Sequence, residues 1–398
     1  MMDPSHAQRV IEDLRIGIPP DGYVCHFTVG RKSEIDRLNT RLKQAQKGAL
    51  LLKANYGSGK THLLRYLKER ALAENYVVSS VTLDAKSAVR FNRMDQILGA
   101  IWRGLETPNN NGNKGVRPFL SEICSRIEAS KLRKRACFWC DLSNEWRWDY
   151  SEVLEAPSIF IAIRAWLTDK STLHDLVEAW FYDPQVYKNQ RKELYTRLIW
   201  QLRGHFRDPR YDWQFYKDGI FDFQVQAYTQ SWAALRDIHR LSVEAGYRGF
   251  IILFDEFEDV IHNIRNIQHQ ESAFWNLFQF YGAKKFDGMT YFAVTPDFAK
   301  KCKSLLLEKG RWDYDYSLFD KLPTFEMSPL TAEELQELAL KIFEVHGIAY
   351  DWEPDSVMKM HELKVIVAKA ASVQVQDRAR QTIKEIVRHL DRLLEDME

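Results

Sequence analysis

The stretch "KANYGSGKTHLL", from Lys53 to Leu64, decides the fold. Gly59, Lys60 and Thr61 match the second half of the phosphate-binding pattern G-x-x-x-x-G-K-[ST]. This pattern lies between a strand and a helix. The apolar run "ALLLKA" leads into it, and apolar residues follow it at helical spacing. Strand, loop and helix therefore occur in the order that a nucleotide-binding loop requires. The alternative is a chance glycine-rich turn.

Each position of this loop has an expected role. Glycines leave the backbone free to direct N–H groups at phosphate oxygens. Lys60 is expected at the β- and γ-phosphates of ATP, and the Thr61 hydroxyl on Mg²⁺. The pattern's first glycine is replaced by Ala54, the smallest alternative, so we expect little distortion. The predicted nucleotide contacts of the loop are Gly57, Ser58, Gly59, Lys60, Thr61 and His62.

A second segment, "GFIILFDEFED", supplies acids at the end of a strand. Five apolar residues precede Asp255 and Glu256, as in a buried parallel strand, and ligands of α/β sheets bind at such carboxyl ends. Asp255 is expected to hold Mg²⁺ through water, and Glu256 to orient and polarise the water that attacks ATP. The alternative is an ordinary strand-to-loop transition with exposed acids. Paired with the phosphate loop, the segment favours ATP hydrolysis.

Composition sets the frame for these motifs. The chain has 398 residues, is 45% hydrophobic and 28% charged, and carries a net charge of +1. Two or three structural units are expected, with no overall charge that points to a partner. No run is long enough to span a membrane, and the polar N-terminus lacks the apolar core of a signal peptide, so we expect a cytoplasmic protein. Cys137 and Cys140 form an isolated C-x-x-C pair, which favours buried thiols over zinc.

The order of elements predicts an α/β fold: a P-loop core with a parallel sheet, a large helical insertion between the second and third core strands, and a C-terminal helical lid. Further strands are predicted at 76–84, at "MTYFAV" ending at Val294, and at the sheet edge over 323–327. The lid helix begins with a capping box at Thr331. The expected units are an N-terminal helical and irregular segment (1–28), the first part of the core (29–106), an aromatic-rich insertion (107–245), the second part of the core (246–328) and the lid (329–398).

A basic segment lies inside the insertion. Lys188 to Arg210 holds seven Lys or Arg and two acids, interleaved with aromatic residues. Such a segment predicts contact with nucleic-acid phosphates, and the alternative is a solvated helix face. The cations expected to contact DNA are Lys188, Arg191, Lys192, Arg197 and Arg203.

The motifs together resemble AAA+ ATPases of the origin-recognition kind. In that family the segment matching Val29 and Gly30 borders the adenine, and the residue matching Thr295 is the polar sensor 1. The resemblance also implies that Arg380 is sensor 2, the arginine that reaches the γ-phosphate of its own subunit. Arg311 is the best candidate for an arginine finger supplied to a neighbouring subunit, and the alternative is a solvated arginine beside aromatic residues.

A closer resemblance covers residues 9 to 391. The segments "IEDLRIGIPP", "ANYGSGKTHLL", "SIFIAIRAWL", "FDEFED", "AVTPDF" and "SPLTAEEL" are similar to the BrxC/BrxD-like P-loop ATPases of bacterial phage-defence islands. This implies an ATPase that assembles with itself or with a defence helicase, nuclease or methyltransferase. Two other functions stay open: a STAND-type switch in which nucleotide exchange flips an interaction surface, and an origin-binding or helicase-loading ATPase.

Overall fold

Six strands form one sheet in a computed structural model of the chain, in the order β3-β2-β4-β5-β1-β6. The structure describes residues 2–84, 89–110, 112–129, 154–167, 171–182, 225–258, 264–357, 360–371 and 377–397. The strands are β1 (Gly48–Lys53), β2 (Val77–Thr82), β3 (Leu105–Glu106), β4 (Phe250–Asp255), β5 (Met289–Val294) and β6 (Thr324–Glu326). All neighbouring pairs are parallel except β2 and β3. The predicted α/β fold with a P-loop core is confirmed, and the antiparallel β3 is an addition to it.

The sheet brings the ends of three strands together. β5 lies between β1 and β4, pairing Leu50 with Tyr291 on one side and Leu253 with Tyr291 on the other. The parallel pairing places the carboxyl ends of β1, β4 and β5 at one edge. Ligands of α/β sheets bind at such an edge. The phosphate loop after β1 and the acids after β4 therefore share this edge.

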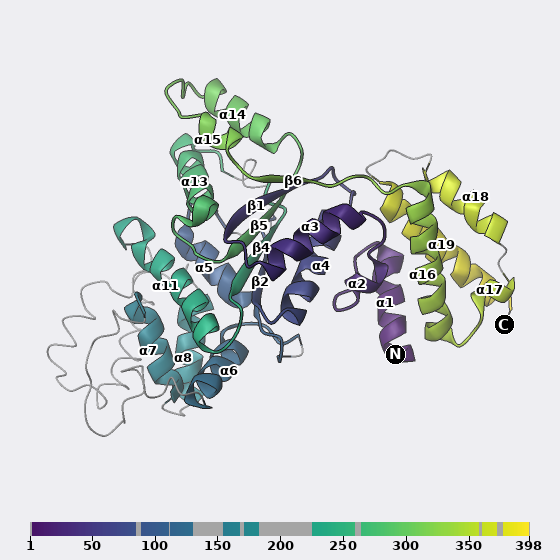
Figure 1. Cartoon of the computed structure of the whole chain (residues 1–398), viewed down its shortest axis with the longest axis horizontal. Coiled ribbons are helices and arrows are strands. Elements are labelled where there is room, and N and C mark those ends of the chain that lie inside the picture. Colours follow the sequence, from purple (N-terminus) through teal and green to yellow (C-terminus); the bar gives the residue numbers. More distant parts are fainter. Residues whose placement is uncertain are drawn as a thin grey trace.

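Helices cover both faces of the sheet (Figure 1). Alternate residues of β4 point to opposite faces, so that Phe250 and Phe254 join one core while Ile251 and Leu253 join another. One face is covered by α3 (Lys32–Lys43) and α4 (Lys60–Ala73). The other is covered by α5 (Met94–Arg103), α11 (Val225–Glu244) and α13 (Ile267–Phe280), which leads into the short η5 (Tyr281–Ala283).

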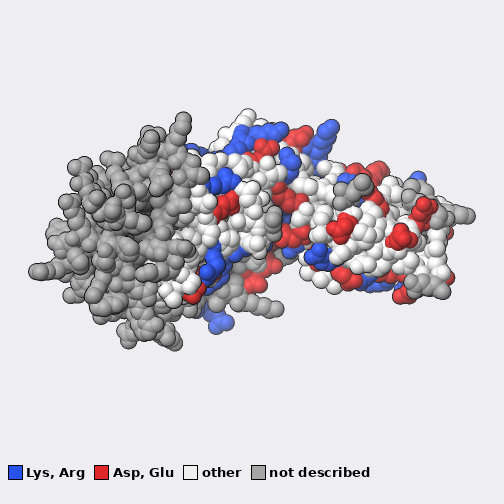
Figure 2. Space-filling model, turned by 90° about the horizontal axis from the view of Figure 1, so that it is seen from below, with Lys and Arg blue, Asp and Glu red and all other residues white. Residues whose placement is uncertain are grey.

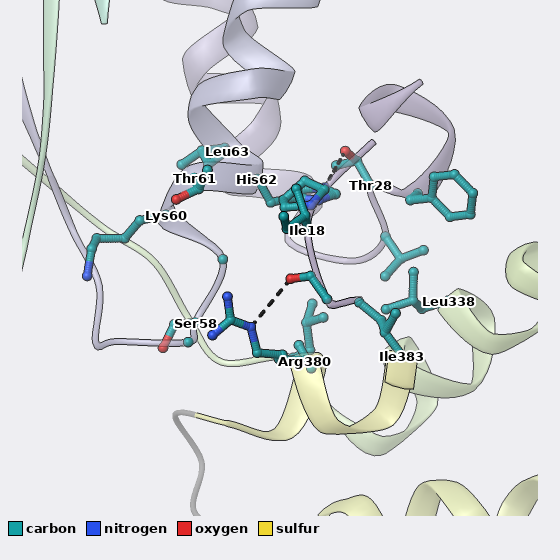
Figure 3. A pocket seen from close by; sticks show the side chains of 18 of the residues that line it. Ile18, Thr28, Ser58, Lys60, Thr61, His62, Leu63, Leu338, Arg380 and Ile383 are labelled. Atoms are coloured by element: carbon teal, nitrogen blue, oxygen red, sulfur yellow. Dashed lines mark hydrogen bonds between the residues drawn. The ribbon is translucent and has the colours of Figure 1, made fainter. Parts of the chain in front are cut away.

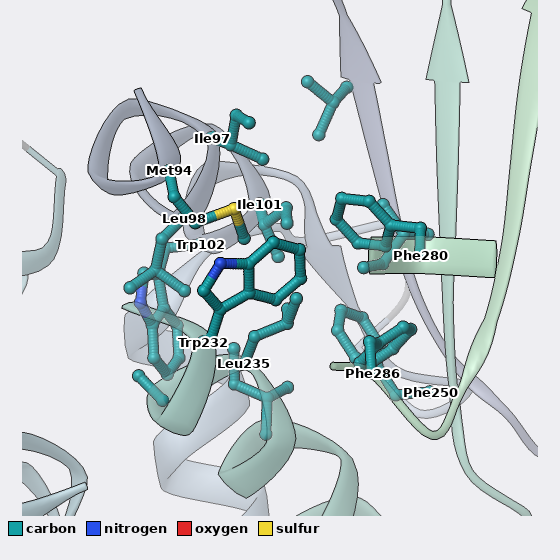
Figure 4. Packing of buried hydrophobic residues seen from close by; sticks show 14 of the residues in the cluster. Met94, Ile97, Leu98, Ile101, Trp102, Trp232, Leu235, Phe250, Phe280 and Phe286 are labelled. Atoms are coloured by element: carbon teal, nitrogen blue, oxygen red, sulfur yellow. The ribbon is translucent and has the colours of Figure 1, made fainter. Parts of the chain in front are cut away.

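The described helices of the region 107–245 pack into the apolar core that contains Phe250 and Phe254. They are α6 (Val116–Ala129), α7 (Pro157–Leu167), α8 (Ser171–Tyr182) and α11. Figure 4 shows Trp232 of α11 among Ile97, Leu98 and Ile101 of α5, beside Phe280 and the sheet. Trp102 of α5 also stacks on Phe181 of α8, with ring centroids 4.5 Å apart. These helices thus share one hydrophobic core with the sheet.

The lid is a helical bundle joined by the N-terminal helix. Its helices are α16 (Ala332–Tyr350), α17 (Pro354–Val357), α18 (Met360–Ala371) and α19 (Arg378–Glu395). The capping box predicted at Thr331 is present, with Glu334 as its partner. The first helix, α1 (Pro4–Ile16), packs its buried residues Ala7, Val10, Ile11 and Leu14 into the same apolar cluster (Figure 1). The lid is therefore built from both ends of the sequence.

Three short or peripheral helices complete the fold: α2 (Val24–Phe27), α14 (Phe298–Glu308) and α15 (Ser317–Asp320). Within the described ranges, none of the helices combines the length and the apolar character that a bilayer crossing requires. The Cys137–Cys140 pair and the basic segment 188–210 lie outside the described residues.

Candidate functional site

The phosphate loop has the local geometry that its glycines predict. Gly57 and Gly59 have φ values of 71° and 92°, the left-handed region that glycine enters at little cost. Gly59 caps the N-terminus of α4, whose first N–H groups have no partner within the helix. The helix dipole adds partial positive charge at this end. Loop and helix together therefore form an anion site that suits a phosphate group.

Ala54 fits the loop without strain. It is 3% exposed and is not among the residues with positive φ, so its methyl group needs no unusual backbone. Its N–H donates to the Val294 carbonyl at 3.1 Å, extending the pairing of β1 with β5. Its carbonyl accepts from Lys60 Nζ, also at 3.1 Å. The position thus works through its backbone, which alanine supplies as glycine would.

A cavity of about 280 Å³ lies between the core and the lid. Its polar end contains residues of the phosphate loop together with Asp255, Glu256 and Glu258. Its apolar end is formed by the loop after α1 and by the lid, with Ile18, Pro19, Phe27, Val29, Leu338 and Ile383 (Figure 3). The polar end supplies the N–H groups and cations that bind a triphosphate. The apolar end supplies the apolar walls that a purine base requires.

The acids after β4 lie at the polar end. Asp255 Oδ1 accepts the backbone N–H of Glu256 at 2.9 Å, which fixes the turn. Glu256 has a φ of 54°, an uncommon conformation for a residue with a side chain. Such backbone strain collects at functional sites, where the surrounding structure holds it. Asp255, the predicted metal ligand, and Glu256, the predicted catalytic acid, both line the cavity that contains Lys60 and Thr61.

The lining also fits Mg²⁺. No group of three or more His, Cys, Asp or Glu residues placed to hold a metal occurs in the described part of the chain. Mg²⁺ at nucleotide sites keeps several waters and takes one or two protein ligands besides phosphate oxygens. Thr61 and Asp255 line the same cavity and would be those ligands.

Lys60 is held by protein groups. It is 9% exposed, and its Nζ lies 3.1 Å from the Ala54 carbonyl oxygen and 3.4 Å from that of Asn55. Glu258 Oε1 lies 3.5 Å away, and the Tyr56 ring centroid 4.6 Å away. Sequence reasoning missed Glu258, although it is the third acid of "FDEFED". The one signal in the sequence was its position two residues after Glu256.

His62 and Thr28 join the loop to the N-terminal segment. The Thr28 hydroxyl donates to the Val24 carbonyl at 2.9 Å and lies 3.0 Å from His62 Nε2. Because that hydroxyl has one hydrogen, His62 Nε2 is the donor of the second bond. Burial, with the nearby charges of Arg31 and Arg65, lowers the pKa of His62 to about 4. His62 is therefore neutral at pH 7 and lies beside Thr28 in the cavity wall (Figure 3).

Arg380 extends from the lid toward the phosphate loop. It begins on the first turn of α19, lines the cavity, and donates from Nε to the Gly17 carbonyl at 3.4 Å. Figure 3 shows its guanidinium on the side of the cavity that carries Ser58. The lid thus brings a cation to the same space as Lys60, as the predicted role requires.

Gly30 and Arg31 connect the loop to the lid. The Arg31 guanidinium donates to the carbonyls of Ser58, at 3.1 Å, and Ser328, at 2.7 Å. The backbone N–H of Arg31 donates to Glu334 Oε1 at 3.2 Å. Gly30 has a φ of 61°, and a Cβ at this position would overlap the Glu334 carboxylate. Gly30 is absent from the cavity lining, whereas Val29 is part of it.

Two further predicted residues, Thr295 and Arg311, are absent from the cavity lining. Thr295, just after β5 and 4% exposed, stands at the sheet edge between the two motif loops, but it is not part of the lining. Arg311 follows α14 and pairs with Glu271 at 2.9 Å in the same chain.

Comparison with known proteins gives one family. No curated protein and no solved structure matches the chain. The family described as "BREX system ATP-binding protein BrxC/D" matches residues 2–145 and 222–398. The unmatched residues include the segment "SIFIAIRAWL" and the basic segment 188–210. Because the match spans both motif loops, the N-terminal helix and the lid, the chain belongs to the BREX system ATP-binding protein BrxC/D family.

Proposed function

We propose that the protein binds ATP with Mg²⁺ and hydrolyses it at the cavity between core and lid. The observation that carries this proposal is the shared lining: Lys60 and Thr61 of the phosphate loop, Asp255 and Glu256 of β4, and Arg380 of the lid border one space. The family's ATP-binding description supports the first half of the proposal. Phosphoryl transfer depends mainly on positioning and on electrostatic stabilisation, and these side chains supply both.

Each side chain then has one task. Gly57, Gly59 and the start of α4 present N–H groups to the phosphates, and Lys60 neutralises charge at the β- and γ-phosphates. Thr61, and Asp255 through water, would hold Mg²⁺, which would supply positive charge at the phosphates. Glu256 accepts a hydrogen bond from the attacking water and draws off its proton as the bond to phosphorus forms. Arg380, from the lid, would complete the positive surroundings of the γ-phosphate.

The substitution Glu256→Gln separates binding from hydrolysis. The amide keeps the shape of the side chain but cannot accept the proton, so we expect ATP affinity near that of the wild type and turnover lowered by ~10²–10⁴-fold. Turnover is measured by phosphate release and affinity by calorimetry, with Lys60→Ala as the variant that loses binding. A Glu256→Gln protein that kept more than about a tenth of wild-type turnover would place the base elsewhere.

We further infer a place for this activity in phage defence, in the cytoplasm, in assembly with itself or with a helicase, nuclease or methyltransferase. Membership in a BREX system family supports a defence role.

To act as an arginine finger for a neighbouring subunit, Arg311 would first have to break its ion pair with Glu271. DNA contact is proposed for the basic segment 188–210. Its seven Lys or Arg against two acids support this, and on the face shown in Figure 2 the described Lys and Arg are interspersed with Asp and Glu. Steady turnover would distinguish this proposal from a switch that retains ADP.

A further inference from the structure

Glu258 is a buried carboxylate in the wall of the nucleotide cavity. Its residue is 4% exposed, and it follows Glu256 by two positions in the turn after β4. One oxygen, Oε1, lies 3.5 Å from Lys60 Nζ. The other, Oε2, is buried and has no hydrogen-bond partner among the described residues. A buried carboxylate with one unpaired oxygen is costly, so it needs a reason other than stability.

The surroundings of Lys60 supply that reason. An ammonium group has three N–H donors. In this structure its close neighbours are two carbonyl oxygens, of Ala54 and Asn55, and the Glu258 carboxylate. The two carbonyls accept hydrogen bonds from the ammonium group, whereas the Glu258 carboxylate forms an ion pair with it at 3.5 Å. Glu258 is the only charged group among them, so it is the strongest competitor of a phosphate for this lysine.

We propose that Glu258 is a positioning residue that holds Lys60 when no nucleotide is bound and competes with the ATP phosphates for it. This inference rests on the proposed function, because it assumes that Lys60 binds the triphosphate. Glu258 then lowers nucleotide affinity in two ways. It binds Lys60 in the free protein, and it places a buried negative charge beside the arriving phosphates. Both effects weaken ATP and ADP alike, since both nucleotides carry a β-phosphate.

The substitution Glu258→Gln tests the proposal through two readouts that move in opposite directions. The amide keeps the length of the side chain and removes its charge. We expect ATP and ADP to bind about tenfold more tightly, which corresponds to the loss of a modest charge competition. The nucleotide-free variant should melt at a lower temperature, because Lys60 loses its buried partner. A merely structural role would lower stability and affinity together.

Glu106→Gln is the matched control. Glu106 is 5% exposed and pairs with Lys68 at 3.3 Å, so the variant also removes the charge of a buried carboxylate beside a lysine, but Glu106 does not line the cavity. Its nucleotide affinity should stay within about twofold of the wild type, a change well below the tenfold step of 1.4 kcal/mol. A double-substitution cycle of Glu258→Gln with Lys60→Met, followed by the melting temperature without nucleotide, should show coupling between the two positions.

Two results would overturn one of the proposals. Wild-type protein that binds ATP while Glu258→Gln binds it equally or more weakly would overturn the role of Glu258 and leave the proposed function intact. Wild-type protein that binds no ATP would overturn the proposed function itself. Should Glu258→Gln fail to fold, Glu258→Met has a similar length, removes the same charge and carries the same expectation.

Discussion

Ala54 occupies the one position where the phosphate loop departs from its pattern. Its backbone forms two hydrogen bonds, to Val294 and from Lys60, and its methyl group is buried without positive φ. Nothing at this position depends on the absence of a side chain. The sequence hypothesis that alanine is harmless here therefore agrees with the geometry, and binding has yet to test it.

We expect Ala54→Gly to leave ATP affinity within about threefold, a change of less than 1 kcal/mol. Stability should fall by about 0.4–1 kcal/mol, since glycine gives the unfolded chain more freedom. Calorimetric titration and thermal unfolding measure the two effects, and Lys60→Ala, which removes the cation at the phosphates, should abolish binding. A large gain in affinity from Ala54→Gly would mean that the natural loop is impaired.

Among the elements, the start of α16 and the start of α3 depend on one another. Glu334 closes the capping box of α16 with Thr331 and also accepts the N–H of Arg31, which is the N-cap of α3. Gly30 allows this approach, because any Cβ there would overlap the Glu334 carboxylate. One carboxylate thus joins the lid to the segment before α3, whose Val29 and Arg31 line the cavity.

Gly30→Ala is therefore expected to displace Glu334 and to cost about 2–3 kcal/mol: ~1 for the left-handed backbone and ~1–2 for the weakened cap. Denaturant unfolding measures the loss. Gly246→Ala is the matched control, because Gly246 has a φ of 88° but no neighbouring atom within 4 Å of the position that a Cβ would take. It should cost about 1 kcal/mol, the backbone penalty alone. Equal losses in the two variants would argue against the contact with Glu334.

The elements show how far sequence reasoning reached. Strands β1, β4 and β5 were predictable, because each is an apolar run buried on both faces. Strand β2 has the same apolar start but two exposed residues, and the edge strand β6 buries only Phe325. The acids Asp255 and Glu256 line the cavity, and their predicted roles toward Mg²⁺ and water stay predictions. The pairing of Glu258 with Lys60 was not predictable, since it depends on how the turns after β1 and β4 face each other. The two-residue β3 carries no periodic pattern at all.

At the scale of the whole molecule, the salt dependence of DNA binding tests whether the basic segment 188–210 contacts DNA. Each neutralised phosphate releases condensed counterion, so log affinity for duplex DNA falls by about 0.9 per contact for each log unit of salt. Replacing Arg191, Lys192, Arg197 and Arg203 by Gln should flatten that slope by several units and weaken binding regardless of sequence. Fluorescence anisotropy across ~50–200 mM salt measures the slope.

ATP turnover without DNA serves as the control for this quadruple variant. It should be unchanged, because the four residues belong to the predicted insertion and to none of the motifs assigned to the nucleotide site. An unchanged salt slope would mean that the segment is a solvated helix face that does not contact DNA.

The place of α1 in the lid has a consequence for how the molecule can be divided. The chain crosses between lid and core twice, once after α1 and again before α16. A cut at the second crossing would not yield two self-sufficient halves, because α1 would stay on the core fragment while its apolar face belongs to the other. With two covalent tethers, the lid also has less freedom than a domain on a single linker. Any movement of the lid against the core has to bend both crossings, and residues of both, among them Pro19 and Leu330, line the cavity.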